Sequence, residues 1–143
     1  MSTLEEINQQ IAFINGGKPA GFQSLIKYLP GILNPGEEIE ALVEGSFNDD
    51  LMVLVSTADR LIFLTSNTHG ANLQTASLAY TEITSVQHRQ QKKFWAGYVG
   101  SVRITGSGTE ITVDSIYNYN ARDFAGQVLA RVENCSEKPG TAK

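Results

Sequence analysis

The sequence predicts a mainly β protein of the α+β class, in which antiparallel strands are closed by one C-terminal helix. Residues 36–117 alternate short β-branched or apolar runs with turn-forming clusters of Gly, Asn and Asp. Amphipathic stretches with helical spacing flank this region, within residues 2–33 and from residue 120 onward. With 143 residues, of which 41% are apolar, the chain has the size and composition of one globular domain.

The first 33 residues are expected to form two short helices. Ser2 with Glu5, or Thr3 with Glu6, has the spacing of a capping box. Two apolar stripes follow at helical intervals, the first ended by Asn15-Gly16-Gly17 and the second by Pro30-Gly31: Leu4, Ile7, Ile11 and Ile14, then Phe22, Leu25, Ile26 and Leu29. Helices this short are not stable alone, so the stripes must pack on the rest of the chain, on a second copy or on a lipid surface.

Seven strands are expected between these helices and the C-terminal one. The run LMVLVST at 51–57 is apolar enough to be a central strand, and most connections have hairpin lengths, which favours an antiparallel sandwich or barrel. The expected strands cover residues 38–47, 51–57, 60–65, 75–80, 83–90, 94–105 and 109–116.

A last helix is expected after Asn120, which has the residue type of an N-cap. Its apolar face carries Ala121, Phe124, Val128 and Val132. The polar residues 136–143 that follow are expected to form a mobile tail.

Four segments in this order resemble the bacterial pleckstrin-homology-like (PH-like) family, YokE type: NPGEEI (34–39), STADRLIFLT (56–65), LAYTEITSV (78–86) and YNARDFAGQVLARV (119–132). The resemblance covers about residues 34–133 and implies a PH-like seven-stranded barrel or sandwich capped by the last helix. The expected domain limits are an N-terminal helical extension at 1–33, a PH-like domain at 34–135 and a flexible tail at 136–143. The family resemblance also implies a binding or scaffold module, which in some members forms symmetric oligomers.

Several kinds of chemistry are disfavoured by the residues present. Eleven Lys and Arg against fifteen Asp and Glu, a formal charge of −4, weigh against nucleic-acid binding. Asp49 and Asp50 lie in the loop where eukaryotic PH domains carry the cations that bind phosphoinositides. His69, His88 and Cys135 have no zinc-ligand spacing, and no nucleophile motif is present. We therefore expect no catalytic residues, no cofactor and no metal.

The start of the chain has no secretory signal pattern, and the longest apolar run, LMVLV at 51–55, is far too short to span a bilayer. A soluble cytoplasmic protein is expected. Thr57 and Arg60 flank the turn between the second and third strands, and we interpret Arg60 as a brace of this turn rather than a ligand-binding residue.

The stretch HRQQKKFWAGYVG at 88–100 combines basic and aromatic residues. Strand alternation places Phe94, Tyr98, Val102 and Ile104 inside, and Trp95, Val99 and Arg103 outside. Lys92 and Lys93 are expected at a hairpin tip.

Two functional hypotheses follow from this stretch and from the N-terminal stripes. The first is a non-enzymatic module that self-associates or docks a protein partner, with the following interface: Trp95, Val99, Ile7, Ile11, Phe22 and Leu25. The alternative is peripheral contact with a membrane or an anionic ligand through a basic patch: His88, Arg89, Lys92, Lys93 and Arg103.

Overall fold

A computed structural model describes residues 3–14, 23–47, 50–66, 73–93, 97–106, 108–116 and 121–141. The described residues form the following elements: α1 (Leu4–Ile14), α2 (Gln23–Ile26), α3 (Leu29–Ile32), β1 (Ile39–Phe47), β2 (Asp50–Thr57), β3 (Leu61–Ser66), β4 (Leu73–Leu78), the short 3-10 helix η1 (Tyr80–Glu82), β5 (Ile83–Lys93), β6 (Gly97–Gly106), β7 (Thr109–Ile116) and α4 (Ala121–Thr141). This order confirms the predicted fold class of seven antiparallel strands followed by a C-terminal helix.

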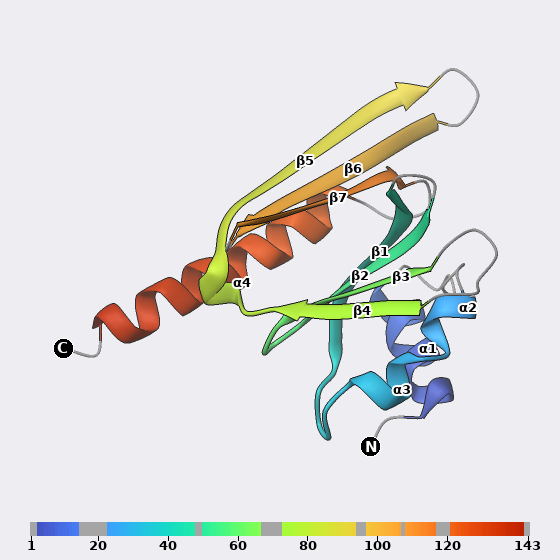
Figure 1. Cartoon of the computed structure of the whole chain (residues 1–143), viewed down its shortest axis with the longest axis horizontal. Helices are drawn as coiled ribbons and strands as arrows, with labels where there is room; N and C mark the ends of the chain where they lie inside the picture. The colour runs from blue at the N-terminus through green and yellow to red at the C-terminus, as the bar shows by residue number, and fades with distance from the viewer. Residues whose placement is uncertain are drawn as a thin grey trace.

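The seven strands form one strongly bent sheet in the order β4-β3-β2-β1-β7-β6-β5. All the pairings are antiparallel, and β1 joins β7 at the pair Ser46 and Asp114. Figure 1 shows β5, β6 and β7 lying opposite β3 and β4, with α4 running along one side of the space between them. Among the described strands, β4 and β5 are therefore the two edges of the sheet.

The inner core fills the space between the two halves of the sheet. It contains aliphatic side chains from all seven described strands, Tyr80 of η1 and one face of α4, where Phe124 and Val128 are buried as predicted. The inner core consists of Val43, Met52, Leu54, Leu61, Leu78, Tyr80, Ile83, Val102, Ile104, Ile111, Val113, Ile116, Ala121, Phe124 and Val128. Cys135 is half-buried against it.

The outer core lies on the other face of β1, β2 and β3, where α1, α2 and α3 cover the sheet (Figure 1). Its members are Ile7, Ile11, Leu25, Ile26, Leu29, Leu33, Ile39, Leu42, Val53, Val55, Ile62 and Leu64. Both faces of β2 are thus buried, which explains why its sequence is continuously apolar rather than alternating. The N-terminal stripes pack on the chain's own sheet.

Local sequence signals predicted the start of α1 correctly but the end of the second predicted helix incorrectly. The capping box at the start of α1 uses Thr3 and Glu6: the Glu6 amide donates to Thr3 Oγ1 at 3.2 Å and the Thr3 amide to Glu6 Oε1 at 3.0 Å. Pro30 and Gly31 do not end a helix but lie in the first turn of α3, where the missing amide of proline costs no hydrogen bond.

One prediction about the later elements was wrong. Lys92 and Lys93 are not at a hairpin tip, because β5 continues to Lys93 and pairs them with Tyr98 and Gly97. α4 extends to Thr141, into the segment expected as a mobile tail from residue 136, and the mobility of that segment stays a prediction.

The Glu37 clamp joins the chain before β1 to the β2–β3 turn. Arg60 donates from Nε to Glu37 Oε2 and from Nη2 to Oε1, both at 3.0 Å, and Nη2 also donates to the Ile32 carbonyl at 2.8 Å. Thr57 Oγ1 donates to Glu37 Oε2 at 2.7 Å, and the Asn34 amide donates to Oε1 at 2.9 Å. The structure thus gives Arg60 the bracing role interpreted from sequence, and it adds Glu37 as its partner.

Tyr80 supports the same turn from inside the barrel. Its hydroxyl donates to the carbonyls of Thr57 at 2.6 Å and Arg60 at 3.0 Å and also contacts Ser56 Oγ at 2.8 Å. Burial raises the pKa of Tyr80 to about 12, so the phenol remains a donor at neutral pH. The turn is held from both faces of the sheet.

Gly45 allows β1 to approach β7 closely. A Cβ atom at this position would lie 2.2 Å from the carbonyl oxygen of Asp114 and 2.6 Å from Val113 Cγ1. This approach is where the two halves of the sheet are joined, so any side chain here forces them apart.

Replacing Gly45 with Ala is expected to reduce the free energy of unfolding by about 2 kcal/mol, because backbone atoms must move to admit the methyl group. Gly126→Ala is the matched control: Gly126 lies on the exposed side of α4 with no atom in reach of the added Cβ. It is expected to increase stability by about 0.5 to 1 kcal/mol. Urea denaturation measures the free energy of unfolding of both variants. Equal values would contradict the close approach of β1 to β7 at Gly45.

Glu37→Gln is expected to cost about 3 kcal/mol, because it leaves the Arg60 charge partly buried without its carboxylate. Burial by itself raises the pKa of Glu37, but hydrogen bonds from Arg60, Asn34 and Thr57 outweigh it and hold the pKa below its ordinary value. A lowered pKa means that the carboxylate's contribution is complete above the unfolded-state value of about 4.3 and is lost as pH falls through the folded-state pKa.

The advantage of the wild type over Glu37→Gln is therefore expected to shrink as denaturation is repeated at successively lower pH. Glu38→Gln, at the exposed neighbouring position, is the control with little effect. An advantage that stays constant into the acid range would show that ionised Glu37 does not carry the clamp.

Candidate functional site

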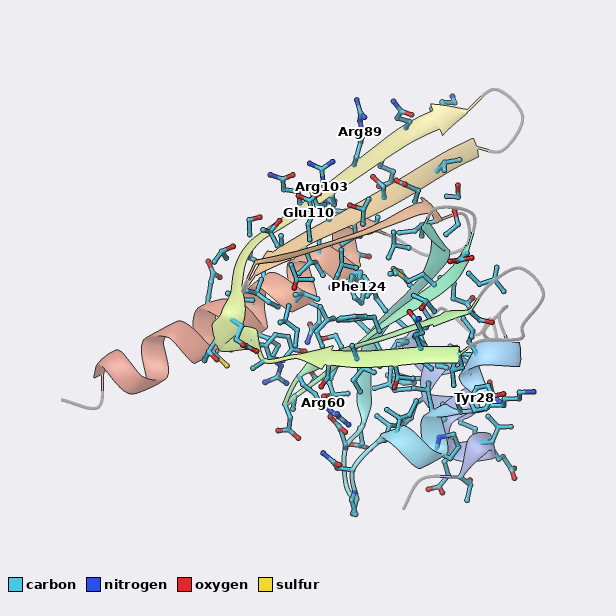
Figure 2. The ribbon with its side chains drawn as sticks, in the orientation of Figure 1. Tyr28, Arg60, Arg89, Arg103, Glu110 and Phe124 are labelled. Atoms are coloured by element: carbon cyan, nitrogen blue, oxygen red, sulfur yellow. The ribbon has the colours of Figure 1, made fainter. Side chains whose placement is uncertain are left out.

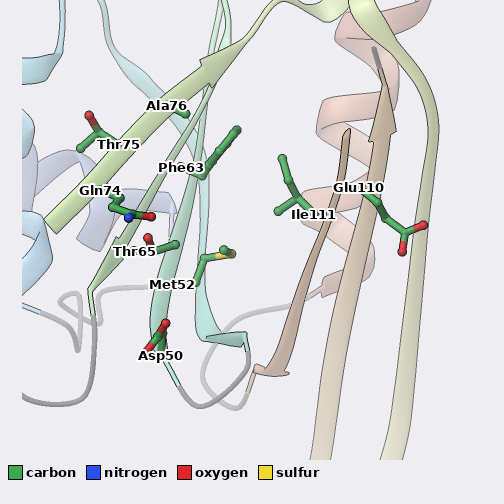
Figure 3. A pocket seen from close by; sticks show the side chains of 9 residues that line it. All are labelled: Asp50, Met52, Phe63, Thr65, Gln74, Thr75, Ala76, Glu110 and Ile111. Atoms are coloured by element: carbon green, nitrogen blue, oxygen red, sulfur yellow. The ribbon is translucent and has the colours of Figure 1, made fainter. Parts of the chain in front are cut away.

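The candidate site is a cleft between the inner face of β2, β3 and β4 and the facing strand β7. Its volume is about 560 Å³. Figure 3 shows Phe63 of β3 and Ile111 of β7 projecting toward each other from opposite walls. The lining residues are Asp50, Met52, Phe63, Thr65, Gln74, Thr75, Ala76, Glu110 and Ile111.

The cleft is apolar at its floor and polar along one wall. Met52 and Ile111 are almost completely buried there, and Phe63 is half-buried. Thr65 and Gln74 add neutral hydrogen-bonding groups. Phe63 pairs with Ala76 and Thr65 with Gln74 in the β3–β4 ladder, so these four residues share the inner face of the sheet.

The charges at the cleft are acidic. Asp50 lies at its rim, and Glu110 contributes to the lining although its side chain points away from the gap in Figure 3. No Lys, Arg or His is among the described residues that line it. A polyphosphate would meet repulsion and no compensating cation, so the cleft is suited to neutral or basic groups.

The predicted basic patch is divided between two faces of the sheet. Arg89 and Arg103 project from the same outer face of β5 and β6 (Figure 2), near Gln87 and Ser101. His88 has the opposite strand parity and lies beside α4 residues such as Arg122 and Asp123, although it also contributes to the hollow that Arg89 and Arg103 line. The physical reason is the two-residue period of a strand, which turns adjacent side chains to opposite faces.

The remaining basic residues of the predicted patch do not join Arg89 and Arg103 into one continuous basic surface. Lys92 has the same parity as His88 on β5, and the side chain of Lys93 lies outside the described residues. Arg103 lies 3.9 Å from Glu110, and Asp114 lines the same shallow hollow, so the outer face carries both signs of charge. Arg89 and Arg103 are the members that the structure brings to one surface.

The structure buries three residues of the predicted partner interface in the outer core. Ile7, Ile11 and Leu25 are fully or almost fully buried in the outer core, so they are not available to a partner. The N-terminal helices also do not cover Val99, which lies half-buried on β6. Trp95 and Phe22 lie outside the described residues. Val102 and Ile104 are buried and Arg103 is exposed, as the alternation predicted.

Sequence reasoning missed the cleft because its walls are ordinary strand residues. Met52, Phe63 and Ile111 each occupy the inward position of their strand, which predicts core packing rather than an opening. Phe13 was also missed: it belongs to α1 but lies off the buried stripe and is 87% exposed.

The described residues contain no cluster of three or more His, Cys, Asp or Glu side chains that could bind a metal ion. A search of the same residues for a helix with the length and apolar character of a membrane span finds none.

Comparisons with known proteins agree on one family. A family model described as "Bacterial PH domain" matches residues 33–128, more than half of the chain. No curated protein matches. The solved structures that match show the same fold at low sequence identity.

Two of these structures come from Shewanella. The pleckstrin homology domain of Shewanella amazonensis SB2B is 18% identical, with a TM-score of 0.53 over 73% of this chain and 91% of that one. A DUF1696 family protein with a pleckstrin-homology domain from Shewanella loihica PV-4 is 16% identical, with a TM-score of 0.56 over 79% of this chain and 94% of that one. The narrower resemblance to the YokE type remains a prediction. The order of the strands, the closing helix and the match over residues 33–128 together identify the chain as a member of the bacterial PH-domain family.

Proposed function

We propose that this chain is a non-catalytic docking domain that binds a protein partner in the cleft between β4 and β7. The observation that carries the proposal is the cleft itself: about 560 Å³ with an apolar floor, a neutral polar wall and an acidic rim. Its walls are paired strands, which hold their side chains in fixed positions.

The buried polar groups of the protein support a structural rather than a catalytic use. Glu37, Arg60, Thr57 and Tyr80 are buried or partly buried groups that bind one another and the β2–β3 turn. Glu40, Gln127 and Arg131 link β1 to α4, with Arg131 Nε donating to Glu40 Oε1 at 2.8 Å and Gln127 Nε2 to the same oxygen at 3.1 Å. The polar groups of both networks are thus occupied with one another and with the backbone, which supports the cleft as the binding surface.

Filling the cleft is expected to abolish partner binding. Ala76 is exposed and shares the inner face with Phe63, so Ala76→Trp places an indole in the cleft without entering the core. Gln91→Trp is the matched control, because Gln91 is exposed on β5, at the other edge of the sheet. The full chain serves as bait in a lysate of the organism that encodes it, with quantitative mass spectrometry of the captured proteins.

A partner of the cleft is expected to be captured by the wild type and by Gln91→Trp. Its capture by Ala76→Trp is expected to fall about tenfold or more, equivalent to about 1.4 kcal/mol. Capture that is equal for the two tryptophan variants would contradict docking at this site. Sedimentation velocity over a range of concentrations tests self-association, and a constant monomer is expected.

Contact with an anionic membrane surface is a second candidate, favoured by the presence of Arg89 and Arg103 on one exposed face. Weak, salt-sensitive co-sedimentation is expected with phosphatidylserine-containing vesicles and not with pure phosphatidylcholine. Arg89→Gln/Arg103→Gln is expected to abolish it, whereas Arg122→Gln, at an exposed position on α4, leaves it unchanged. Binding that survives the double substitution would exclude this face.

A further inference from the structure

The two edges of the sheet differ in how they are protected against pairing with another strand. β5 carries His88, Arg89, Lys92 and Lys93, and its pairing with β6 is irregular between Ile83 and Ser85. Charged side chains and bulges are the features by which natural edge strands avoid pairing with other chains. The β5 edge is therefore a protected one.

The β4 edge has none of these features. Its sequence is LQTASL, without a charge, a proline or a glycine, and it pairs with β3 over six consecutive residues without a register shift. Residues 74–77 are exposed. A regular, uncharged edge of this kind leaves a row of backbone donors and acceptors open to an incoming strand.

The cleft lies directly beside this unprotected edge. Gln74, Thr75 and Ala76 of β4 form one of its walls. A strand added to β4 would turn alternate side chains to the same face as Gln74 and Ala76, and a large one would reach across the short Ala76 side chain toward Phe63, its partner on β3. The other side chains would lie on the opposite face, with Thr75 and Ser77.

From these observations we infer that β4 binds an extended segment of the partner by strand addition, and that this segment carries a large apolar side chain for the cleft and a Lys or Arg for Asp50. The inference rests on the proposed function and specifies its binding mode and the chemistry of its ligand. A basic segment is favoured because Asp50, the charged residue at the rim of the cleft, is acidic and the whole chain has a formal charge of −4.

A second copy of this chain is a poorer occupant. Pairing of β4 with another β4 would bring only Gln74, Ala76 and Leu78 to the inner face, and Leu78 is already buried in the inner core. The short side chain of Ala76 would leave the hollow over Phe63 unfilled. A segment of different sequence, with a bulky residue at one inward position, matches the cleft better.

The test begins with a display library of random seven-residue segments, selected on the full-length chain and counter-selected on Ala76→Trp. We expect the enriched segments to alternate apolar with other residues and to contain Lys or Arg. Two N-methylated forms of the best synthetic peptide then test the backbone pairing. One form is methylated at odd positions and the other at even positions, so that in an added strand only one set of amides faces β4.

Methylation of the set facing β4 is expected to raise Kd about tenfold or more, because each lost hydrogen bond leaves an unpaired group, while the other set changes Kd by less than about twofold. Thr75→Lys/Ser77→Lys is expected to weaken the peptide similarly, because it charges the open edge. Gln91→Lys, at an exposed position on the β5 edge, is the control with no effect on Kd.

The other outcomes separate the inference from the proposed function. Peptides that bind the wild type but tolerate both methylation patterns would overturn strand addition and leave docking in the cleft intact. A library in which no segment distinguishes the wild type from Ala76→Trp would overturn both. A concentration-dependent dimer that is lost in Thr75→Lys/Ser77→Lys would identify a second copy as the occupant and overturn the inferred ligand.

Discussion

Burial of both faces of β2 is the constraint on which the rest of the structure depends. Val53 and Val55 point to one side and Met52 and Leu54 to the other, and all four are almost completely excluded from solvent. Burying an aliphatic side chain of this size contributes about 2 kcal/mol, so each face must be covered. α1, α2 and α3 cover one side, and the folded-over strands with α4 cover the other.

The Glu37 clamp links these layers at the end of β2. Its carboxylate receives hydrogen bonds from β2 through Thr57, from the following turn through Arg60 and from the segment after α3 through the Asn34 amide. Because Arg60 also binds the Ile32 carbonyl, one ion pair fixes the direction in which the chain leaves the helical layer and enters β1. The cleft depends on the position of α4 within the bent sheet. This helix fills the inner space along one side and leaves the opening between β4 and β7 uncovered.

Periodicity within the sequence predicted the elements that depend on neighbouring residues. Local spacing alone predicts a capping box at the start of α1, though not the choice between Ser2 with Glu5 and Thr3 with Glu6. It also predicts the buried stripe of α1 and the central position of β2. The division of the basic patch could also have been predicted from the sequence, because the strand alternation that assigned Val102 and Arg103 to opposite faces applies equally to His88 and Arg89. The continuation of β5 to Lys93 depends instead on pairing with β6, which no local pattern encodes.

The candidate site was not predictable in this way. Alternation shows that Met52, Phe63 and Ile111 face inward, but whether inward residues touch or stand apart depends on how far the two halves of the sheet separate. That separation is set by Gly45, by α4 and by the single join between β1 and β7, which are distant in sequence. The partnership of Glu37 with Arg60 is likewise a contact over more than twenty residues, and a glutamate in a Gly-Glu-Glu run carries no sign of it.

The outer core also determines which segment of the chain must be kept together when the domain is transferred into another protein. The family pattern begins at residue 33, yet Ile7, Ile11 and Leu25 lie before that point and share one core with Val53, Val55 and Ile62. A gene fusion or recombination event that kept only the family pattern would carry a sheet with one bare aliphatic face, prone to aggregate during synthesis. The helical segment and the barrel therefore form one folding unit, and a shortened chain would need another cover or a polar outer face.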